Sequence, residues 1–543
     1  MNGVSTRRVT RLASLAFAVG SVTASPGALA AVKPVVTGAV QVTSNPQPVR
    51  AHATPLIARS PKGGVLAVAE VDVAGQRECA VHISTDDGRS WSRGGRLMVE
   101  PFTDCSIGAE FGPHVMPFFD REGVLYVVTT ANDPKDIFEK MRPGTPEFPR
   151  VRSFVPRNVY LSRSIDGGRT FSTRLVFEAP KENPHQGYNY APVGAVDPND
   201  PRYIYVGWAQ GDWQSNVEPG KAVVAVSTNA GESFGPPFDI SDKQGSEHPW
   251  ISVGRSGVVH ATYWSKGHGT PSAADPTKPF PNGARHDPAP IFHMSSADHG
   301  KTWARQQIDP GNQVWYRPPV VAADPSSDAV YVAWNSVSEP RNYAMDRAGE
   351  ARTDIFLLAS TDDGKTWQPR VTVNEDASGP ANQVLPNLSV APNGRLDIAW
   401  DDFRNSPKPG ANPGNEVGID EIYYTSSTDQ GRSFAPAMRV NDRSIDRSRG
   451  VWSNGIRAQV AVGIASSKES VYFAWQEPRN GDATTNSEDV YAASVQLSAQ
   501  ARPGTSSGAN WGLLGAGIAL GMGLGIVAAW TVYRRSAIAA GVR

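Results

Sequence analysis

Short runs of apolar residues, separated by turn-forming residues, recur along most of the chain. Their length and their content of Val, Ile, Tyr and Trp are typical of β-strands. Such a run often begins just after a proline, as at Pro55, Pro113, Pro192, Pro249, Pro319 and Pro386. The run that follows often ends in tryptophan, at Trp208, Trp264, Trp334, Trp400 and Trp475. Four short strands per unit predict an all-β protein built from four-stranded sheets.

An eight-residue pattern, Ser-x-Asp-x-Gly-x-Ser/Thr-Trp/Phe, occurs six times and gives the chain its period. The copies are residues 84–91, 164–171, 227–234, 296–303, 360–367 and 427–434. The third copy has Asn229 in place of the aspartate. Ser and Asp side chains bond nearby backbone N–H groups, and Gly accepts a positive φ angle. Each copy therefore predicts a tight turn, with its last aromatic ring packed into the core.

This pattern resembles the Asp box of sialidases and related β-propellers, and the resemblance extends over about residues 38–499. It implies a ring of four-stranded blades, in which the box joins the third and fourth strands away from the active face. The aspartates of the boxes are therefore not counted as catalytic.

The number of blades follows from the number of repeating units. Six units carry a box, and a seventh, residues 451–496, has three strand signals and lacks a fourth. Residues 38–45 resemble the strands that follow two later boxes, so we expect them to complete that blade. Pairing the first strand with the last leaves no open edge. We expect a β-propeller of seven blades; the alternative is six, the number in catalytic sialidases.

Both ends of the chain carry membrane signals. Residues 1–30 have a basic start, a short apolar run and a small-residue cleavage site, which predict a signal peptide rather than the alternative, a retained anchor. Residues 31–499 form the expected propeller and 500–510 a linker. Residues 511–533 hold no charge and are long enough for a transmembrane helix.

The basic residues Arg534 and Arg535 open a short cytoplasmic tail, 534–543, because basic flanks stay inside. The expected localisation is the cell membrane, single-pass type I, with the propeller outside the cytoplasm. Gly517, Gly521 and Gly525 favour a helix-pairing face and hence a homodimer, although glycine is common in such helices.

The charge balance and the cysteine content limit which ligands and which covalent links we expect. Lys and Arg number 52 against 53 for Asp and Glu, so no basic excess favours nucleic acid. Cys79 and Cys105 are the two cysteines, and an exported pair favours a disulfide over two free thiols. No Cys/His spacing suggests a metal site, and no cofactor is implied.

Long insertions indicate which face carries function. The connections between second and third strands are long at residues 132–157, 266–290, 335–352 and 401–418. They all emerge on one rim of a propeller, and insertions confined to one face commonly mark the binding face. The alternative is that they are tolerated surface insertions.

Three loops contain similar sequences, SEPRN, DDFRN and QEPRN, which carry Arg341, Arg404 and Arg479 beside carboxylates. Planar guanidinium groups suit the carboxylate of an anionic sugar. The alternative is structural: each arginine pairs with a neighbouring acid and braces its own blade.

The resemblance to sialidases implies three substrate-binding arginines, a tyrosine nucleophile activated by glutamate, and an aspartic acid. Ala53 stands where the first arginine is expected, and Asp72 is the nearest carboxylate to the position of the acid. A rearranged site would use Arg317, Arg404, Arg457, Arg479 and Tyr190 for the substrate. Its catalytic residues would be Tyr316, Glu247 and Asp402.

The sequence therefore predicts a membrane-anchored, extracellular, sialidase-like propeller that engages a glycan or glycoconjugate, with exo-sialidase hydrolysis as its candidate reaction. One alternative is a non-catalytic surface propeller that binds a glycan or a protein. Another is a different carbohydrate-active propeller, such as a polysaccharide lyase, which would use rim tyrosines, arginines and histidines. The candidate histidines are His114, His185, His248 and His268.

Overall fold

The computed structural model describes residues 34–44, 50–72, 78–97, 105, 115–131, 157–180, 187–211, 220–241, 246–265, 290–309, 319–337, 353–375, 381–406, 418–450, 462–481, 485 and 487–497. They belong to the first of two compact units, Met1–Ser498. The expected signal peptide, linker, membrane helix, glycine face and tail lie outside the described residues. Within the described ranges, no helix is long and apolar enough to cross a membrane.

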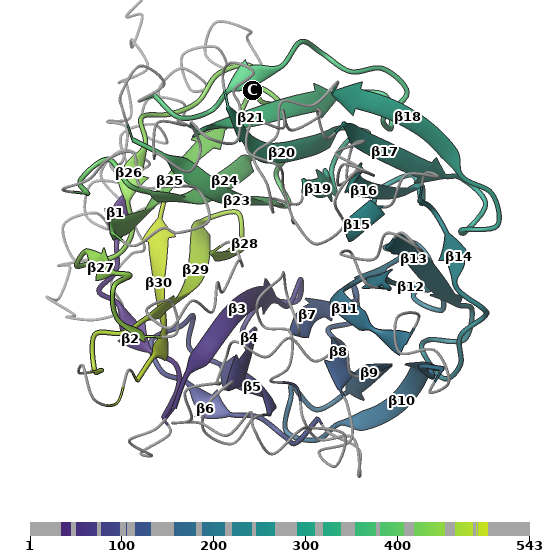
Figure 1. Ribbon diagram of the computed structural model, residues 1–543, viewed down its shortest axis with the longest axis horizontal. Coiled ribbons are helices and arrows are strands. Elements are labelled where there is room, and N and C mark those ends of the chain that lie inside the picture. The colour runs from purple at the N-terminus through teal and green to yellow at the C-terminus, as the bar shows by residue number, and fades with distance from the viewer. Residues whose placement is uncertain are drawn as a thin grey trace, which may run out of the picture. The chain divides into compact units, whose positions relative to one another are not determined.

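The described strands form seven antiparallel sheets arranged as the blades of a β-propeller (Figure 1). The first strands of the blades surround the centre in the order β3, β7, β11, β15, β19, β23 and β28, and β28 in turn contacts β3. The expected fold class, an all-β propeller of four-stranded blades, is confirmed, and the number of blades is seven.

The strands of the first four blades are, from the centre outwards, β3 (His52–Arg59), β4 (Leu66–Asp72), β5 (Cys79–Ser84) and β6 (Ser92–Arg93); β7 (Val115–Phe119), β8 (Leu125–Ala131), β9 (Asn158–Ser164) and β10 (Ser172–Phe177); β11 (Asn189–Val196), β12 (Ile204–Gln210), β13 (Lys221–Ser227) and β14 (Phe238–Asp239); β15 (Ser246–Val253), β16 (Val259–Ser265), β17 (Ile291–Ser296) and β18 (Ala304–Asp309). Those of the other three are β19 (Val320–Ala323), β20 (Val330–Val337), β21 (Thr353–Ser360) and β22 (Val371–Thr372); β23 (Gln383–Val390), β24 (Leu396–Asp402), β25 (Ile419–Ser427) and β26 (Met438–Arg439), with β27 (Ile445–Asp446) also paired to β25; and β28 (Gly463–Ser466), β29 (Ser470–Glu477) and β30 (Asp489–Gln496), with β1 (Val35–Val36) and β2 (Val40–Gln41) outermost.

The seventh blade joins the two ends of the propeller sequence. Its third strand, β30, pairs with β1 and β2, with Val35 opposite Gln496 and Val40 opposite Ala492. In Figure 1 the purple N-terminal strands lie beside the yellow strand β30. The expectation that residues 38–45 supply the missing strand is confirmed for β2, and β1 extends the pairing toward the N-terminus. This closure removes the open edges of the ring.

In four blades the inner strand begins before its proline, whereas β19 begins at Val320, directly after Pro319 as the sequence predicted. In blades 1, 3, 4 and 6 the proline lies inside the strand, where the pairing register shifts at a β-bulge. The residue before the proline has a positive φ angle: 54° at Thr54, 51° at Ala191, 49° at His248 and 56° at Leu385. Proline is tolerated here because a bulge residue need not donate to the ladder. In these four blades the proline therefore marks the bulge and not the start of the strand.

The six eight-residue copies form equivalent turns between third and fourth strands. In the first, the Ser84 hydroxyl donates to Asp86 Oδ1 (2.8 Å) and accepts from the N–H of Gly88 (2.8 Å). Asp86 also accepts from the N–H and the hydroxyl of Ser90, at 2.9 and 2.7 Å. In the third copy, Asn229 keeps these contacts by accepting from Ser233 N–H and donating to its hydroxyl. These side chains serve the turn, which agrees with their exclusion as catalytic groups.

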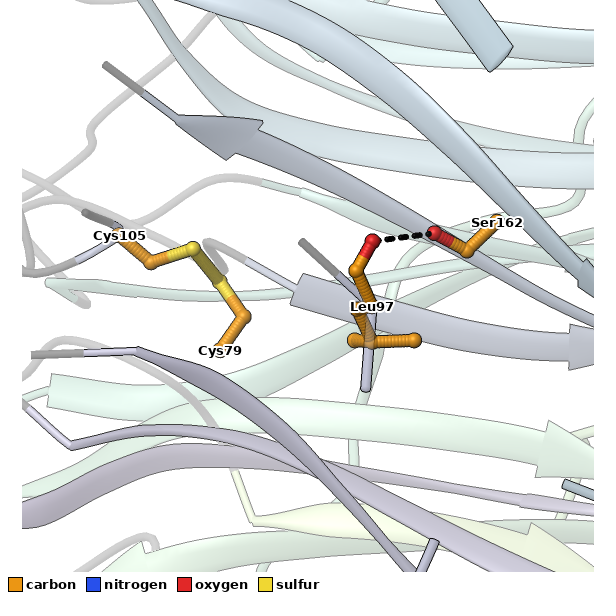
Figure 2. The surroundings of a disulfide bond; sticks show 4 residues. All are labelled: Cys79, Leu97, Cys105 and Ser162. Carbon is orange, nitrogen blue, oxygen red and sulfur yellow. Dashed lines mark hydrogen bonds between the residues drawn. A yellow bond between two sulfur atoms is a disulfide. The ribbon is translucent and has the colours of Figure 1, made fainter. Parts of the chain in front are cut away.

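Cys79 and Cys105 form a disulfide bond across 26 residues of sequence (Figure 2). Cys79 opens β5 in blade 1, and Cys105 lies in the connection to blade 2. Figure 2 also shows Leu97, in the same connection, whose carbonyl accepts a hydrogen bond from the Ser162 hydroxyl of β9 at 3.4 Å. The connection is therefore tied to both blades.

Removing this disulfide should destabilise the propeller. A bond that closes a loop of 26 residues restricts the unfolded chain, and its loss should lower the free energy of unfolding by about 3 kcal/mol. Chemical unfolding of the double variant Cys79→Ala, Cys105→Ala measures this against the oxidised parent. The parent under reducing conditions is the control and should approach the variant. An unchanged unfolding midpoint in both would contradict the prediction.

Candidate functional site

The strand directions define two rims. First strands begin, second strands end and third strands begin at one rim, which we call the loop rim because it carries the long connections. The eight-residue turns lie at the opposite rim. The described candidate residues Tyr190, Asp402, Arg404 and Arg479 all lie at the loop rim, as does the backbone of Glu247 in β15. The sequence thus placed these candidates on one face.

Asp402 and Arg404 are held together at the end of β24 in blade 6. The Arg404 guanidinium donates to both oxygens of Asp402, at 2.9 and 2.7 Å. Asp402 Oδ2 also accepts from the indole N–H of Trp400 at 2.8 Å. The guanidinium stacks 4.0 Å from the ring centre of Tyr423 in the same blade. The Asp402 carboxylate, proposed as acid or base, is thus fully buried and already accepts hydrogen bonds from an arginine and a tryptophan.

Blade 7 repeats this arrangement. Arg479 donates to both oxygens of Glu477, at 2.7 and 2.6 Å, and Trp475 donates to Glu477 Oε2 at 3.0 Å. Arg479 lies 3.9 Å from the ring centre of Tyr491 and also binds Asp442 at 2.8 Å. Two of the four arginines predicted for the substrate therefore bind carboxylates of their own blades. This geometry matches the structural alternative drawn from the repeated sequence.

Tyr190 belongs to a buried aromatic group at the start of β11. Its ring lies 5.1 Å from Tyr188 and 5.3 Å from His248 of the next blade. The guanidinium of Arg157 lies 5.2 Å from the Tyr188 ring centre. Burial lowers the pKa of His248 to about 3, so its imidazole is neutral at pH 7. The structure thus brings one candidate tyrosine and one candidate histidine together.

The other predicted site residues cannot be placed. Tyr316, Arg317, Arg457, His114, His185 and His268 lie outside the described residues, and so does the side chain of Glu247. Their roles remain predictions.

A buried charged group that the sequence did not single out occupies blade 1. Glu70 lies between His52 and His82, whose ring nitrogens are 3.0 and 3.1 Å from its two oxygens. Burial by itself lowers the pKa of His52, but the charge and hydrogen bond of Glu70 outweigh burial and raise that pKa to about 9. Burial likewise raises the pKa of Glu70, and the two histidines overcome it and lower that pKa to about 2. His52 and Glu70 therefore form an ion pair at neutral pH.

In blade 3 an uncharged pair occupies the position of this group. Trp208 in β12 opposes the bulge of β11 and donates to Asn189 at 2.8 Å. Glu70 opposes the equivalent bulge of β3, and His52 has the position of Asn189. The sequence signal was available: blade 1 reads VLAVAE where other blades read IYVGW, VYVAW or LDIAW.

A second buried group joins blades 6 and 7. Arg447 lies 2.8 Å from Asp420 and 3.8 Å from both Asp401 and Glu488, and it donates to the carbonyl of Gln476 at 3.3 Å. Burial lowers the pKa of Arg447, but the three carboxylates outweigh burial and raise it above its usual value. Three carboxylates from two blades thus share this guanidinium.

Most of the buried ion pairs described at the loop rim lie on one side of the ring, although Arg157 in blade 2 and Asp354 in blade 5 are also buried at this rim. Blade 1 contributes Glu70 and its histidines, and the blade 6–7 junction contributes the Arg447 group. Between them, Arg50 binds Asp489 at 2.7 Å. We call the rim of blades 6, 7 and 1 the charged arc. Among the described residues, no group of His, Cys, Asp and Glu could hold a metal ion.

No protein-family model and no curated protein matches the chain. Solved structures with a similar course include an α-L-arabinanase of Penicillium chrysogenum complexed with arabinobiose, at 12% identity and a TM-score of 0.42, over 67% of this chain and 94% of that one. A Hadza microbial sialidase shares 12% identity over 79% and 75% of the chains, with a TM-score of 0.40. An ulvan lyase of a new polysaccharide lyase family shares 10% identity over 82% and 93%, with a TM-score of 0.46. At these identities and TM-scores, no activity or substrate carries over to this chain.

Proposed function

We propose that this protein binds carbohydrate outside the cytoplasm through its loop rim, and that the charged arc forms one wall of the binding site. The signal peptide and membrane helix expected from residues 1–30 and 511–533 support this location. The resemblance of the eight-residue turns to the Asp boxes of sialidases supports the ligand class.

The observation that carries the proposal is the asymmetry of the loop rim. Features that serve the fold recur in most blades, as the eight-residue turns and the buried tryptophans do. The His52–Glu70–His82 and Arg447 groups do not recur at equivalent positions of the other described blades. Burying charged groups costs folding free energy even when they are paired. Because these two groups are absent from the equivalent positions of the other described blades, the repeated fold does not explain them. Ligand binding at that arc is a reason to retain them.

Hydrolysis of a glycosidic bond is the second candidate, because carboxylates outnumber the arginine in the Arg447 group. Glycoside hydrolases need two carboxyl groups that flank the bond. The pairing of Arg404 and Arg479 within their blades favours binding without catalysis, so binding is placed first.

Binding and hydrolysis can be tested together with the full chain in detergent. We expect it to bind members of a glycan array, and Arg404→Ala to weaken that binding about tenfold, because the loss of the pair with Asp402 disturbs the loop rim of blade 6. The matched control is Arg432→Ala, an exposed arginine of an eight-residue turn on the opposite rim, which should leave binding unchanged. Equal losses in both variants, or no binding by the parent, would contradict the proposal.

The same protein is then incubated with 4-methylumbelliferyl sialoside, beside Arg317→Ala. Release that the variant loses would assign sialidase activity to a relocated arginine site. Binding to the array without release from this or other fluorogenic glycosides would identify a carbohydrate-binding propeller.

A further inference from the structure

Two buried histidines face each other inside blade 4. His260 in β16 and His293 in β17 are 0% and 1% exposed, and their rings stack with centres 5.3 Å apart. Nδ1 of His260 lies 3.2 Å from Nε2 of His293, a distance that suits one hydrogen bond between neutral imidazoles. Burial disfavours a charge on either ring, and two positive charges in contact repel each other. The folded blade therefore holds the pair in its neutral form.

This pair packs against the next blade of the ring. A Cβ added at Gly364, in the eight-residue turn of blade 5, would collide with the His293 ring. The Trp367 ring of the same turn meets His293 edge-on, with ring centres 5.0 Å apart. His293 thus lies in the seam between blades 4 and 5. Solvating the rings from this side requires the turn of blade 5 to move away.

The repeated fold does not require histidine at this seam. Blade 5 has Tyr331 at the position of His260 and Leu357 at that of His293. Leu357 lies against Gly431 in the turn of blade 6, as His293 lies against the turn of blade 5. The turn glycines of blades 2, 3, 4 and 6 all meet apolar side chains of the preceding blade, namely Ile83, Leu161, Val226 and Leu357. The histidine pair is therefore particular to the seam between blades 4 and 5.

One carboxylate of blade 5 lies near His260. A Cβ added at Gly254 would be 3.3 Å from Nε2 of His260 and 3.5 Å from Oδ1 of Asp363. Asp363 already accepts a hydrogen bond from the Ser256 hydroxyl at 3.0 Å. Within its own sheet, His260 has serines as cross-strand neighbours. Asp363 is thus the group that could compete with burial for the charge state of His260.

Burial determines the charge state of both rings. With a smaller contribution from the charge of His293, it lowers the pKa of His260 to about 3. It lowers the pKa of His293 to about 4, and the residues beside that ring, Gln306 and Trp367, do not titrate. When water reaches the rings, they take up protons near pH 6.5. Weak acid therefore favours a form of the protein in which this seam is open.

We propose that the seam between blades 4 and 5 is an acid-operated latch, in which the neutral His260–His293 pair keeps the two blades together and its protonation separates them while the other blades stay folded. Opening one seam disrupts fewer contacts than unfolding the ring, so acid acts on the seam first. The latch goes beyond the proposed function, because it concerns how the propeller responds to pH and not what it binds.

A single engineered thiol reports the opening of one seam, because both cysteines of the chain are joined in the disulfide. Thr262→Cys places the thiol at the latch, where the Thr262 hydroxyl donates to the carbonyl of Pro319 in blade 5 at 3.0 Å. Ala333→Cys is the matched control at the equivalent position of blade 5, packed against blade 6. Both residues are 0% exposed, so each thiol reacts only when its seam opens.

The measurement is the labelling rate of each full-length variant in detergent with 4,4′-dithiodipyridine, which reacts with thiols in acid. The ratio of the two rates, latch to control, cancels the pH dependence of the reagent. We expect this ratio to rise about a hundredfold from pH 6.5 to pH 5, because each of the two histidines contributes about tenfold. It should return to its starting value at pH 7.5.

Two further variants assign the response to the pair. His260→Tyr with His293→Leu transfers Tyr331 and Leu357 of blade 5 to blade 4, and the ratio should then stay constant with pH. His299→Gln removes a partly exposed histidine from the turn of the same blade and takes its residue from the equivalent position of blade 6. It should keep the hundredfold rise.

The outcomes that overturn the latch are distinct. A constant ratio in the chain that keeps both histidines would show that acid loosens the two seams alike. A falling ratio would show that Asp363 captures the protonated His260 and tightens the seam. An equal rise in the double histidine variant would assign the response to other groups. Each of these results contradicts the proposal and leaves the proposed function untouched.

Discussion

Replacing Arg447 by methionine should lower the free energy of unfolding by about 3–5 kcal/mol. The side chain of Arg447 is 3% exposed, and its removal leaves Asp401, Asp420 and Glu488 without a guanidinium that they share. Uncompensated buried carboxylates are costly, because water cannot replace the lost positive charge. The variant should also loosen the junction between blades 6 and 7, since Arg447 contacts both. Urea unfolding, followed by tryptophan fluorescence, measures the difference.

The matched control is Arg255→Met, which breaks the ion pair of Arg255 with Asp328 at 2.6 Å. That pair is shorter but about half exposed, at 53% and 42%, so its loss should cost about 1 kcal/mol or less. Similar losses for the two variants would show that burial does not determine the contribution of Arg447.

The second large effect is a loss of stability in weak acid. Burial lowers the pKa of His248 to about 3, of His260 to about 3 and of His293 to about 4. In the unfolded chain the same groups take up protons near pH 6.5. Because the folded protein disfavours the protonated forms, each histidine should cost about 1.4 kcal/mol per pH unit below 6.5. Between pH 6.5 and 5 the three together should cost about 6 kcal/mol, a large part of a typical folding free energy.

Other groups act outside this pH range. The stability that the raised pKa of His52 confers is fully present below pH 6.5 and is lost as pH rises through about 9. The lowered pKa of Glu70, about 2, and those of Asp298 and Asp362 in the eight-residue turns, also about 2, confer stability that is lost only below about pH 4. The slope between pH 6.5 and 4.5 therefore reports mainly on the buried neutral histidines.

Blade 3 supplies a histidine-free version of the His260–His293 pair. Nδ1 of His260 lies 3.2 Å from Nε2 of His293. In blade 3 the strand registers place Tyr205 at the position of His260, Val224 at that of His293 and Val226 at that of Ser295. The triple variant His260→Tyr, His293→Val, Ser295→Val transfers the blade 3 residues to blade 4. We expect it to lose about two thirds of the slope, and His248 to account for the rest. Unfolding free energies at half-unit steps of pH test this, and an unchanged slope would refute the assignment.

The charged arc was not predicted from the sequence, and the reason is distance along the chain. Arg50 meets Asp489, and Thr54 meets Gln476, only because the last blade pairs with the first strands of the propeller. No local pattern encodes such a contact. Glu70 was visible as a departure from the tryptophan repeat, but its histidine partners follow from the pleat and the bulge of β3 and not from spacing alone.

The contacts of two candidate arginines, in contrast, could be predicted from the sequence. Arg404 and Arg479 each follow a carboxylate by two residues, so their pairing is local and the repeated sequence indicated it. Whether Arg317 and Arg457 meet near a substrate remains a prediction, because both lie outside the described residues.

The sequence by itself determined the all-β class, the turns between third and fourth strands and the strand that closes the seventh blade. The first two depend on hydrogen bonds within eight residues and on apolar runs of one strand, so local chemistry is sufficient to specify them. The closing strand was found by its resemblance to the strands that follow two later copies of the eight-residue pattern. Only the tertiary structure decided which charges are buried together and which polar atoms lack partners. Those properties depend on how neighbouring blades pack, where side chains from distant parts of the chain exclude water from one another.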